Sequence, residues 1–160
     1  MIISINSLKE TSQLAAVLAT TLKNKSSALI ALNGELGAGK TTFVSCLIKS
    51  LGSKEDVSSP TFVLQHEYQC ETLKIEHWDM YRLKVVPDEV LEPLNKNTIR
   101  IIEWADKFPQ EIKPDLTILF SLVCSSKPKD GIEEEVKREV KIFGKILSDL
   151  REALLKWSQS

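Results

Sequence analysis

The stretch GELGAGKT at residues 34–41 decides the fold of this chain. It matches GxxxxGK[ST], a loop in which glycines let backbone N–H groups turn inward around a β-phosphate. The lysine of this motif neutralises the β- and γ-phosphates and its last residue binds Mg²⁺ through a hydroxyl, which assigns these roles to Lys40 and Thr41. Thr42 follows within reach of the α-phosphate. The loop therefore predicts a site for a nucleoside triphosphate.

The segments on both sides of the loop have the character that this motif requires. Residues 28–32 form a short apolar run that is typical of a buried strand. Residues 40–51 have helical periodicity, and Gly52 follows where a helix C-cap is expected. The order strand, glycine loop, helix also directs the positive end of the helix at the phosphates.

Apolar periodicity farther from the loop predicts a mixed α/β chain. We expect an amphipathic helix over residues 11–22, with Thr11 and Ser12 near its start, and a C-terminal helix with Ile146 and Trp157 on one side. Strands are expected at residues 61–68, 73–79, 99–103, 116–123 and 136–143, with a short helix at 87–94. The first two of these strands can form a hairpin around a polar turn at 69–72. The pattern predicts one P-loop NTPase-like domain over residues 1–160, a sheet flanked by helices.

Composition and charge exclude several classes of protein. The chain has 160 residues, 42% of them hydrophobic and 27% charged, which is typical of a globular domain. Its 21 basic and 22 acidic residues give a net charge of -1, so tight free-standing binding to RNA or DNA is not expected. The N-terminus lacks the pattern of a signal peptide and no apolar run approaches the length of a membrane span, which favours a cytoplasmic protein.

The three cysteines do not form a metal-binding or disulfide pattern. Cys46, Cys70 and Cys124 are odd in number, widely spaced, and have no CxxC or Cys/His partner nearby. We expect reduced structural thiols and no zinc site.

Two carboxylates stand at the ends of expected strands. Asp79 ends LKIEHWD and Glu103 ends IRIIE. A P-loop protein needs an acidic group near the magnesium ion, usually at the carboxyl end of a strand. Position alone does not divide the roles of the two residues, and either can equally be a solvated or salt-bridged carboxylate.

The histidines and tryptophans near these acids have simpler interpretations. His66 and His77 have no motif partner at fixed spacing, which favours packing or surface hydrogen bonds over catalysis. Trp78 and Trp104 flank the acids and could stack on a base, but aromatic residues in strands usually belong to the core, which we expect for Trp78.

Four segments occur together in this order: GELGAGKTTF, VSSPTFVLQHEY, HWDMYRL and IIEWADKFP. Together they resemble the TsaE family, formerly YjeE, and the pattern at residues 11–19 extends the likeness to the first expected helix. The resemblance implies a small bacterial Mg²⁺-dependent ATPase, weakly active alone, that acts with TsaD and TsaB in forming N6-threonylcarbamoyladenosine (t6A) at position 37 of tRNA. Contact with tRNA is then expected through the complex. Residues 82–103 depart from the family pattern, because this segment is shorter and lacks a glycine-containing helix.

The resemblance also implies roles for individual residues. Thr41 and Glu103 would ligate Mg²⁺, while Asp79 and Lys40 would be catalytic, Asp79 by positioning or activating the attacking water. Residues 58–62 match an SPT[FY] segment that resembles a switch able to register the γ-phosphate, although Pro60 can also simply begin a strand. The implied nucleotide-binding residues are Thr11 near the base, Glu35, Leu36, Gly37, Ala38, Gly39, Lys40, Thr41, Thr42 and Trp104.

Other functions of a P-loop protein fit less well. A small-molecule kinase generally needs basic lid residues over the γ-phosphate, and no paired-arginine lid appears among Arg82, Arg100, Arg138 and Arg151. A GTPase-like switch is disfavoured because the NKNT segment at residues 95–98 lacks the aspartate that reads guanine. A nucleotide-binding assembly factor that hardly hydrolyses ATP stays open, since the same residues serve binding and hydrolysis.

Overall fold

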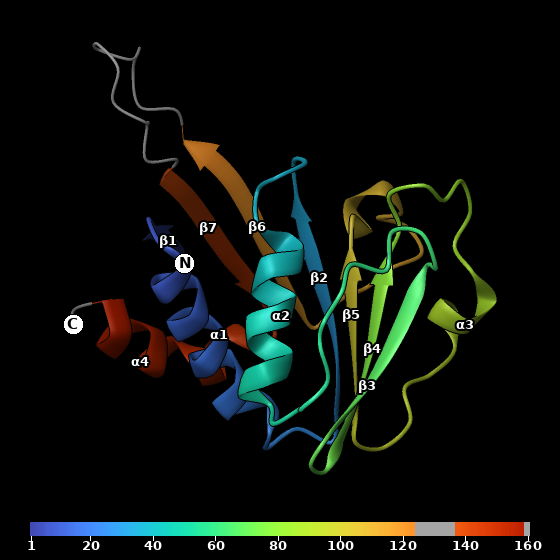
Figure 1. The fold of residues 1–160 in the computed structure, drawn as a ribbon, viewed down its shortest axis with the longest axis horizontal. Coiled ribbons are helices and arrows are strands. Elements are labelled where there is room, and N and C mark those ends of the chain that lie inside the picture. Colours follow the sequence, from blue (N-terminus) through green and yellow to red (C-terminus); the bar gives the residue numbers. More distant parts are fainter. Residues whose placement is uncertain (124–136, 159–160) are drawn as a thin grey trace.

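The computed structural model describes residues 1–123 and 137–158, which form one mixed sheet with helices on its faces (Figure 1). The sheet has seven strands in the order β1-β7-β6-β2-β5-β4-β3. The strands are β1 (Ile2–Ile5), β2 (Ser27–Gly34), β3 (Gln65–Cys70), β4 (Leu73–Asp79), β5 (Thr98–Glu103), β6 (Leu116–Val123) and β7 (Lys137–Gly144). The helices are α1 (Leu8–Leu22), α2 (Lys40–Ser50), α3 (Asp88–Leu91), the 3₁₀ helix η1 (Ala105–Lys107) and α4 (Leu147–Ser158).

The centre of the sheet is parallel and its margins are antiparallel. Strand β2 runs parallel to β5 and β6, and β5 runs parallel to β4. The pairs β3–β4, β6–β7 and β7–β1 are antiparallel. Because β2, β4 and β5 run in the same direction, their carboxyl ends meet at one edge, where a ligand crevice is expected in an open α/β sheet.

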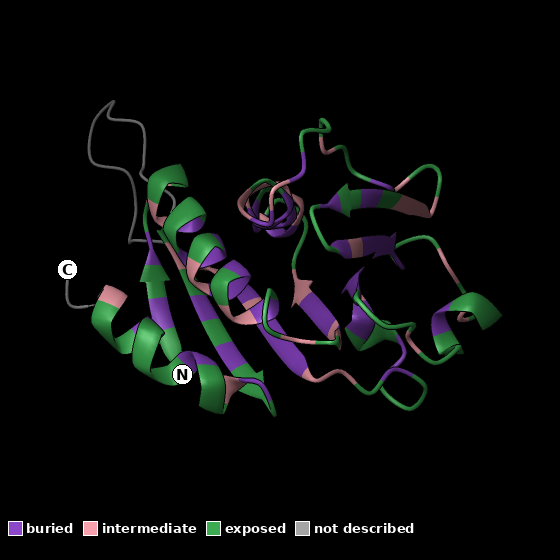
Figure 2. Cartoon of the chain, turned by 90° about the horizontal axis from the view of Figure 1, so that it is seen from below, coloured by how far each residue is buried: buried purple, intermediate pink, exposed green. Residues whose placement is uncertain are grey.

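Side chains alternate between the two faces of the sheet and form two apolar cores. Ile30 and Ile101 belong to the larger core, into which α1, α2 and α4 pack their apolar sides. Ala31 and Ile102, their neighbours along the strands, belong to a smaller core with the segment that contains η1 and with Val90 of α3. Figure 2 shows the buried residues along the strands and the exposed ones mostly on the outer sides of helices and on loops. Glu103, Asp79 and His77 have the same parity as the residues of the larger core and therefore face α2.

The structure confirms the α/β class and most of the expected elements. The strand, glycine loop and helix around residues 34–41 are present, and β3 and β4 form the expected hairpin. Trp78 is in the core, as expected, with 5% of its surface exposed. Residue 136, where the last expected strand begins, lies outside the described residues, as does Cys124.

Two local expectations need correction, and one strand was not expected. Residues 61–64 form a turn instead of the start of a strand, because the amides of Val63 and Leu64 bond back to the carbonyl of Pro60. The first helix is capped by Ser7, whose hydroxyl accepts from the amide of Glu10, so residue 11 lies inside the helix instead of at its start. Strand β1 was not expected, since four residues at a chain end carry little periodicity.

The segment between β4 and β5 is attached by a buried arginine. Arg100 donates to the Glu76 carboxylate at 2.7 Å and to the carbonyls of Val90 and Glu92 at 2.8 and 2.9 Å. These bonds tie the single turn of α3 to the central strands. Within the described part of the chain, no helix combines the length and the apolar character needed to cross a bilayer.

Candidate functional site

The glycine loop leaves β2 through a close contact that only glycine permits. A Cβ atom added at Gly34, where φ is 132°, would lie 2.2 Å from the carbonyl oxygen of Phe120 on β6. At the other end of the loop, Gly39 has φ 101° and caps α2 without any side-chain hydrogen bond. The first N–H groups of a helix have no partners within the helix, so this uncapped end offers donors to an anion.

Lys40 lies inside the loop, almost entirely buried. Its ammonium donates to the carbonyls of Gly34 at 2.7 Å and Glu35 at 2.9 Å, and it lies 3.7 Å from the ring centre of Trp104. Burial lowers the pKa of Lys40 from its ordinary value of 10.5, and the nearby Glu103 carboxylate opposes this effect. The loop thus holds a cation that has carbonyl partners, and no directly bonded carboxylate among the described residues, and that can meet an anionic phosphate.

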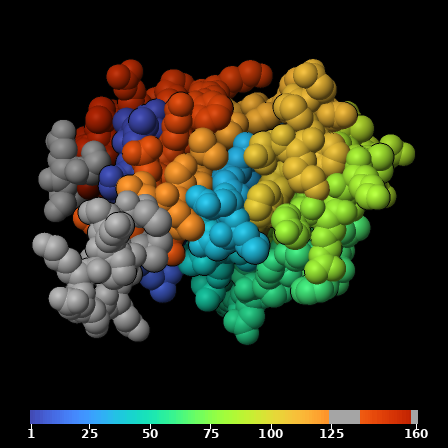
Figure 3. Space-filling model, turned by 90° about the horizontal axis from the view of Figure 1, so that it is seen from above, coloured from blue at the N-terminus to red at the C-terminus, as the bar shows by residue number. Residues whose placement is uncertain are grey.

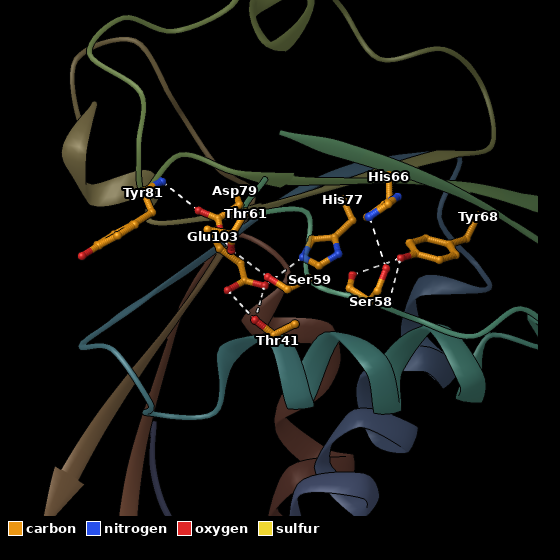
Figure 4. Close-up of polar contacts among 10 residues, drawn as sticks. All are labelled: Thr41, Ser58, Ser59, Thr61, His66, Tyr68, His77, Asp79, Tyr81 and Glu103. Atoms are coloured by element: carbon orange, nitrogen blue, oxygen red, sulfur yellow. Dashed lines mark hydrogen bonds and ion pairs between the residues drawn. The ribbon is translucent and has the colours of Figure 1, made fainter. Parts of the chain in front are cut away.

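The first turn of α2 is joined to the end of β5. The Thr41 hydroxyl lies 2.9 and 3.0 Å from the two carboxylate oxygens of Glu103, and Nε2 of His77 lies 2.8 Å from Oε1 of the same group. Figure 4 shows the three side chains in one hydrogen-bonded chain, with Glu103 between the helix and the sheet. The carboxylate is 2% exposed, so its orientation is set by these two contacts.

A second carboxylate lies next to the first. Asp79 is the direct partner of Glu103 in the register of β4 and β5, so both side chains leave the same face at the same edge. Asp79 accepts from the Thr61 hydroxyl and from the backbone amide of Tyr81 at 2.7 Å (Figure 4). Both contacts donate a hydrogen bond to its carboxylate, so they hold the side chain in place at the edge of the sheet.

The expected catalytic and metal-binding residues line a single pocket. Seen from the carboxyl end of the parallel strands, the loop has the end of β6 on one side and the segments that follow β5 and surround β4 on the other (Figure 3). The walls of the pocket come from the glycine loop, the SPTF segment and the strand ends. The lining residues are Leu36, Gly37, Gly39, Lys40, Thr41, Thr42, Ser59, Thr61, Asp79, Tyr81, Arg82, Glu103 and Trp104.

The oxygen ligands in this pocket suit a Mg²⁺ ion that is also bound by the phosphates of a nucleotide. Among the described residues no group of three or more histidines, cysteines or carboxylates could hold a metal alone. Mg²⁺ usually takes one or two carboxylates, waters and the phosphates of a nucleotide instead of an all-protein cage. The Thr41 hydroxyl and the Glu103 carboxylate provide such a partial set of oxygen ligands.

A smaller pocket adjoins the other side of the loop. It brings together Thr11 on α1 and Thr42 on α2, which were expected near the base and the α-phosphate, and it includes Arg138 of β7. The hydroxyl of Thr11 donates to the carbonyl of Ser7 in its own helix. Sequence reasoning missed Arg138, because only the pairing of β7 with β6 brings it to the loop.

The remaining loop residues lie at the mouth of the site. The Glu35 carboxylate accepts from the amide of Leu122 at 3.3 Å, and Leu36 is 75% exposed. Trp104 has a left-handed backbone with φ 61°, which is uncommon for a bulky residue and places its ring 5.0 Å from that of Tyr81. Backbone strain of this kind is concentrated at binding and catalytic sites.

The SPTF segment is fastened at its beginning and exposed at its end. The Tyr68 hydroxyl contacts both the amide and the carbonyl of Ser58 at 3.3 Å, and His66 Nε2 lies 3.2 Å from the Ser58 hydroxyl. At the other end, Phe62 is 82% exposed, with the Arg82 guanidinium 4.4 Å from its ring centre. Thr61, between these ends, contacts Asp79.

The contact of His77 with Glu103 was not expected from the sequence. A strand places residues i and i+2 on one face, so the spacing in HWD already puts His77 on the same side as Asp79. The sequence has no signal that Glu103 contacts His77, because this contact depends on which strand lies beside β4. By contrast, His66 makes a surface hydrogen bond to Ser58.

Comparisons with known proteins point to one family. A family model described as "Threonylcarbamoyl adenosine biosynthesis protein TsaE" matches residues 5–132. A protein of Rickettsia conorii named tRNA threonylcarbamoyladenosine biosynthesis protein TsaE is 40% identical over 119 residues, covering 71% of this chain and 66% of that protein, just under two thirds of its length. The Aquifex aeolicus protein of the same name is 37% identical over 144 residues, or 88% and 94% of the two chains. The crystal structure of Bacillus subtilis YdiB, at 24% identity, has the same fold, with a TM-score of 0.67 over 98% of this chain and 94% of that one.

Proposed function

The chain belongs to the TsaE family, and on that premise we propose that it binds and hydrolyses ATP with Mg²⁺ in the t6A modification of tRNA position 37. In this role it acts with TsaD and TsaB. The observation that carries the proposal is the convergence of Lys40, Thr41, Asp79 and Glu103 on one pocket at the carboxyl edge of the parallel strands.

Nucleotide binding uses the glycine loop and the start of α2. The uncapped N–H groups of the helix and loop cradle the phosphates, and the buried ammonium of Lys40 exchanges its two carbonyl contacts for phosphate oxygens. Thr11 and Thr42 border the adjoining pocket, which suits the nucleoside part of the ligand. Trp104 packs beside Lys40 and closes the site on the side of β5.

The metal contributes charge neutralisation at the β- and γ-phosphates when it is bound. Thr41 and Glu103 are the residues that would hold it, since they offer a hydroxyl and a buried carboxylate side by side. Contacts from both α2 and β4 fix the orientation of the Glu103 carboxylate.

Hydrolysis needs a group that orients the attacking water. As the water oxygen bonds to the γ-phosphorus, the bond to the bridging oxygen breaks, releasing ADP and phosphate. Asp79 is well placed to orient this water, because its carboxylate borders the same pocket as Lys40 and accepts hydrogen bonds from Thr61 and Tyr81. Thr61 links Asp79 to the SPTF segment, which supports a role of that segment in registering the γ-phosphate.

Kinase activity has less support in the pocket. Among the described residues that line the pocket, the arginine is Arg82. Its guanidinium lies over the ring of Phe62 and is not paired with a second arginine of that lining. The chain has a net charge of -1, so we propose that it reaches tRNA through its partner proteins.

The deciding experiment measures ATP hydrolysis by the full chain with and without TsaD and TsaB, and scores t6A formation in the same reactions. We expect weak hydrolysis alone, faster hydrolysis with the partners, and t6A that depends on this chain. Exposed Lys49, on the same helix as Lys40, provides a control variant, Lys49→Ala, that should behave as wild type. If t6A forms fully without this chain, the proposed role is wrong; if it depends on the chain but not on ATP turnover, the chain is a non-hydrolysing assembly factor.

A further inference from the structure

His77 is a completely buried histidine directly behind the phosphate pocket. It lies on β4 two residues before Asp79, faces α2, and has 0% of its surface exposed. Because its ring is shielded from solvent and is not among the described residues that line the pocket, it cannot act as an acid or base on the nucleotide. Any contribution to the chemistry must pass through a neighbouring residue.

The neighbour that His77 contacts is Glu103. An ionised carboxylate only accepts hydrogen bonds, so the 2.8 Å contact between His77 Nε2 and Oε1 has the imidazole as donor. The other ring nitrogen, Nδ1, is buried and has no hydrogen-bond partner within residues 1–123 and 137–158. The polar function of this ring in the described structure is therefore its bond to Glu103.

The bond of His77 reaches Glu103 from a different element than the bond of Thr41 does. Thr41 contacts the carboxylate from the helix, whereas His77 contacts it from the strand beside β5 (Figure 4). A buried ring with an unpaired nitrogen costs stability compared with an apolar side chain of similar size. Stability alone therefore does not explain a histidine here, whereas fixing the rotamer of a metal-binding carboxylate does.

We propose that His77 is a positioning residue that orients the Glu103 carboxylate toward Mg²⁺. This inference rests on the proposed function, because it requires that Glu103 holds the ion. His77 would act by its hydrogen bond to a metal ligand, and removal of such a hydrogen-bond partner typically lowers metal affinity by about 10- to 100-fold.

Three substitutions separate the hydrogen bond from the volume of the ring. His77→Gln keeps an N–H donor at about the place of Nε2, and His77→Leu fills similar space without a donor. His77→Asn keeps an amide but is too short to reach Glu103. The full chain of each variant is titrated with AMP-PNP by calorimetry, once with MgCl₂ and once with EDTA, and its thermal unfolding is recorded.

The measured quantity is the gain in AMP-PNP affinity that Mg²⁺ produces. We expect His77→Leu and His77→Asn to lose about tenfold or more of this gain, with affinity in EDTA unchanged, and His77→Gln to retain most of it. Combining His77→Leu with Glu103→Ala should cause no loss beyond that of Glu103→Ala alone. A merely structural role would lower both affinities together and would not distinguish Gln from Asn.

Each result decides between the possibilities. The proposal is overturned if His77→Leu keeps the full gain, or if His77→Gln is as defective as His77→Asn. If His77→Leu does not fold, the comparison of Gln with Asn decides alone. If the wild-type protein shows no gain in affinity with Mg²⁺, the proposed function fails at its metal site. If the wild-type protein and His77→Leu show the same gain, only the role of His77 is rejected.

Discussion

The hydroxyl of Thr41 lies 2.9 and 3.0 Å from the two carboxylate oxygens of Glu103. This contact joins the first turn of α2 to the last residue of β5, and the parallel pairing of Leu32 with Glu103 keeps β2, which leads into the phosphate loop, in register with β5. The phosphate loop and the acidic strand end are thus held against each other before any ligand binds. Because the site is preorganised, ligand binding loses less conformational entropy than it would if these residues had to be ordered first.

Replacing Lys40 tests the phosphate loop. Lys40→Ala removes the ammonium that lies among the loop carbonyls, and loss of a buried charge partner costs about 2–5 kcal/mol, roughly 30-fold or more in affinity. We expect ATP binding to be undetectable by titration calorimetry, while Lys49→Ala binds as wild type does. An unchanged affinity of Lys40→Ala would remove the P-loop assignment.

Replacing Asp79 tests catalysis separately from binding. Asp79→Asn keeps the size of the side chain but removes the carboxylate that would orient water, which contributes about 10²- to 10⁴-fold in general base catalysis. We expect ATP affinity to persist and hydrolysis with the partners present to fall by that range in single-turnover assays. The exposed Asp56→Asn is the matched control. Full turnover by Asp79→Asn would exclude Asp79 as a catalytic residue.

Replacing Glu103 tests the metal site. Glu103→Ala removes the buried carboxylate beside Thr41, so the affinity for ATP should fall by about tenfold or more in Mg²⁺ and change little in EDTA. Glu111→Ala, at an exposed position, should show the wild-type response to Mg²⁺. An equal loss in Mg²⁺ and in EDTA would point to a structural role of Glu103.

The contact between Thr61 and Asp79 predicts a link between the SPTF segment and hydrolysis. Thr61→Val keeps the shape of the side chain but removes a hydrogen bond to a charged group, worth about 1.5–3 kcal/mol. We expect kcat to fall by about tenfold or more with ATP affinity preserved. Thr20→Val, at an exposed position of α1, controls for the substitution itself. An unaltered kcat in Thr61→Val would mean that Asp79 does not depend on this segment.

The lowered pKa of Lys40 predicts a pH dependence of nucleotide binding. In the free protein, burial makes Lys40 release its proton below its ordinary pKa of 10.5. Phosphate favours the charged ammonium, so binding raises this pKa and takes up a proton, and affinity falls as pH rises through the lowered pKa. Calorimetry between about pH 7 and about pH 10, in buffers of different ionisation heat, measures the uptake. Lys49→Ala should titrate as wild type does; affinity that is constant over this range would contradict the prediction.

Local sequence was sufficient for the elements nearest the site. The glycine loop and its two flanks could be predicted because turn chemistry and helical periodicity act within a few residues. Strand β1 escaped prediction, because a short strand is stabilised by its pairing with β7 and not by its own pattern. The Ser7 cap, which follows this strand, was missed as well. Residues 61–64 have the apolar composition of a strand, yet backbone bonds to the Pro60 carbonyl fold them into a turn.

The sequence by itself determined that a phosphate loop, an Asp79 and a Glu103 stand at the ends of structural elements. Only the tertiary structure decided their relations: β5 lies between β2 and β4, so Glu103 contacts Thr41 and His77, while Asp79 is left to Thr61 and the Tyr81 amide. The physical reason is that loop and helix follow from short-range backbone preferences. Contacts between strands instead depend on the order and register of a sheet, which the packing of the whole chain selects.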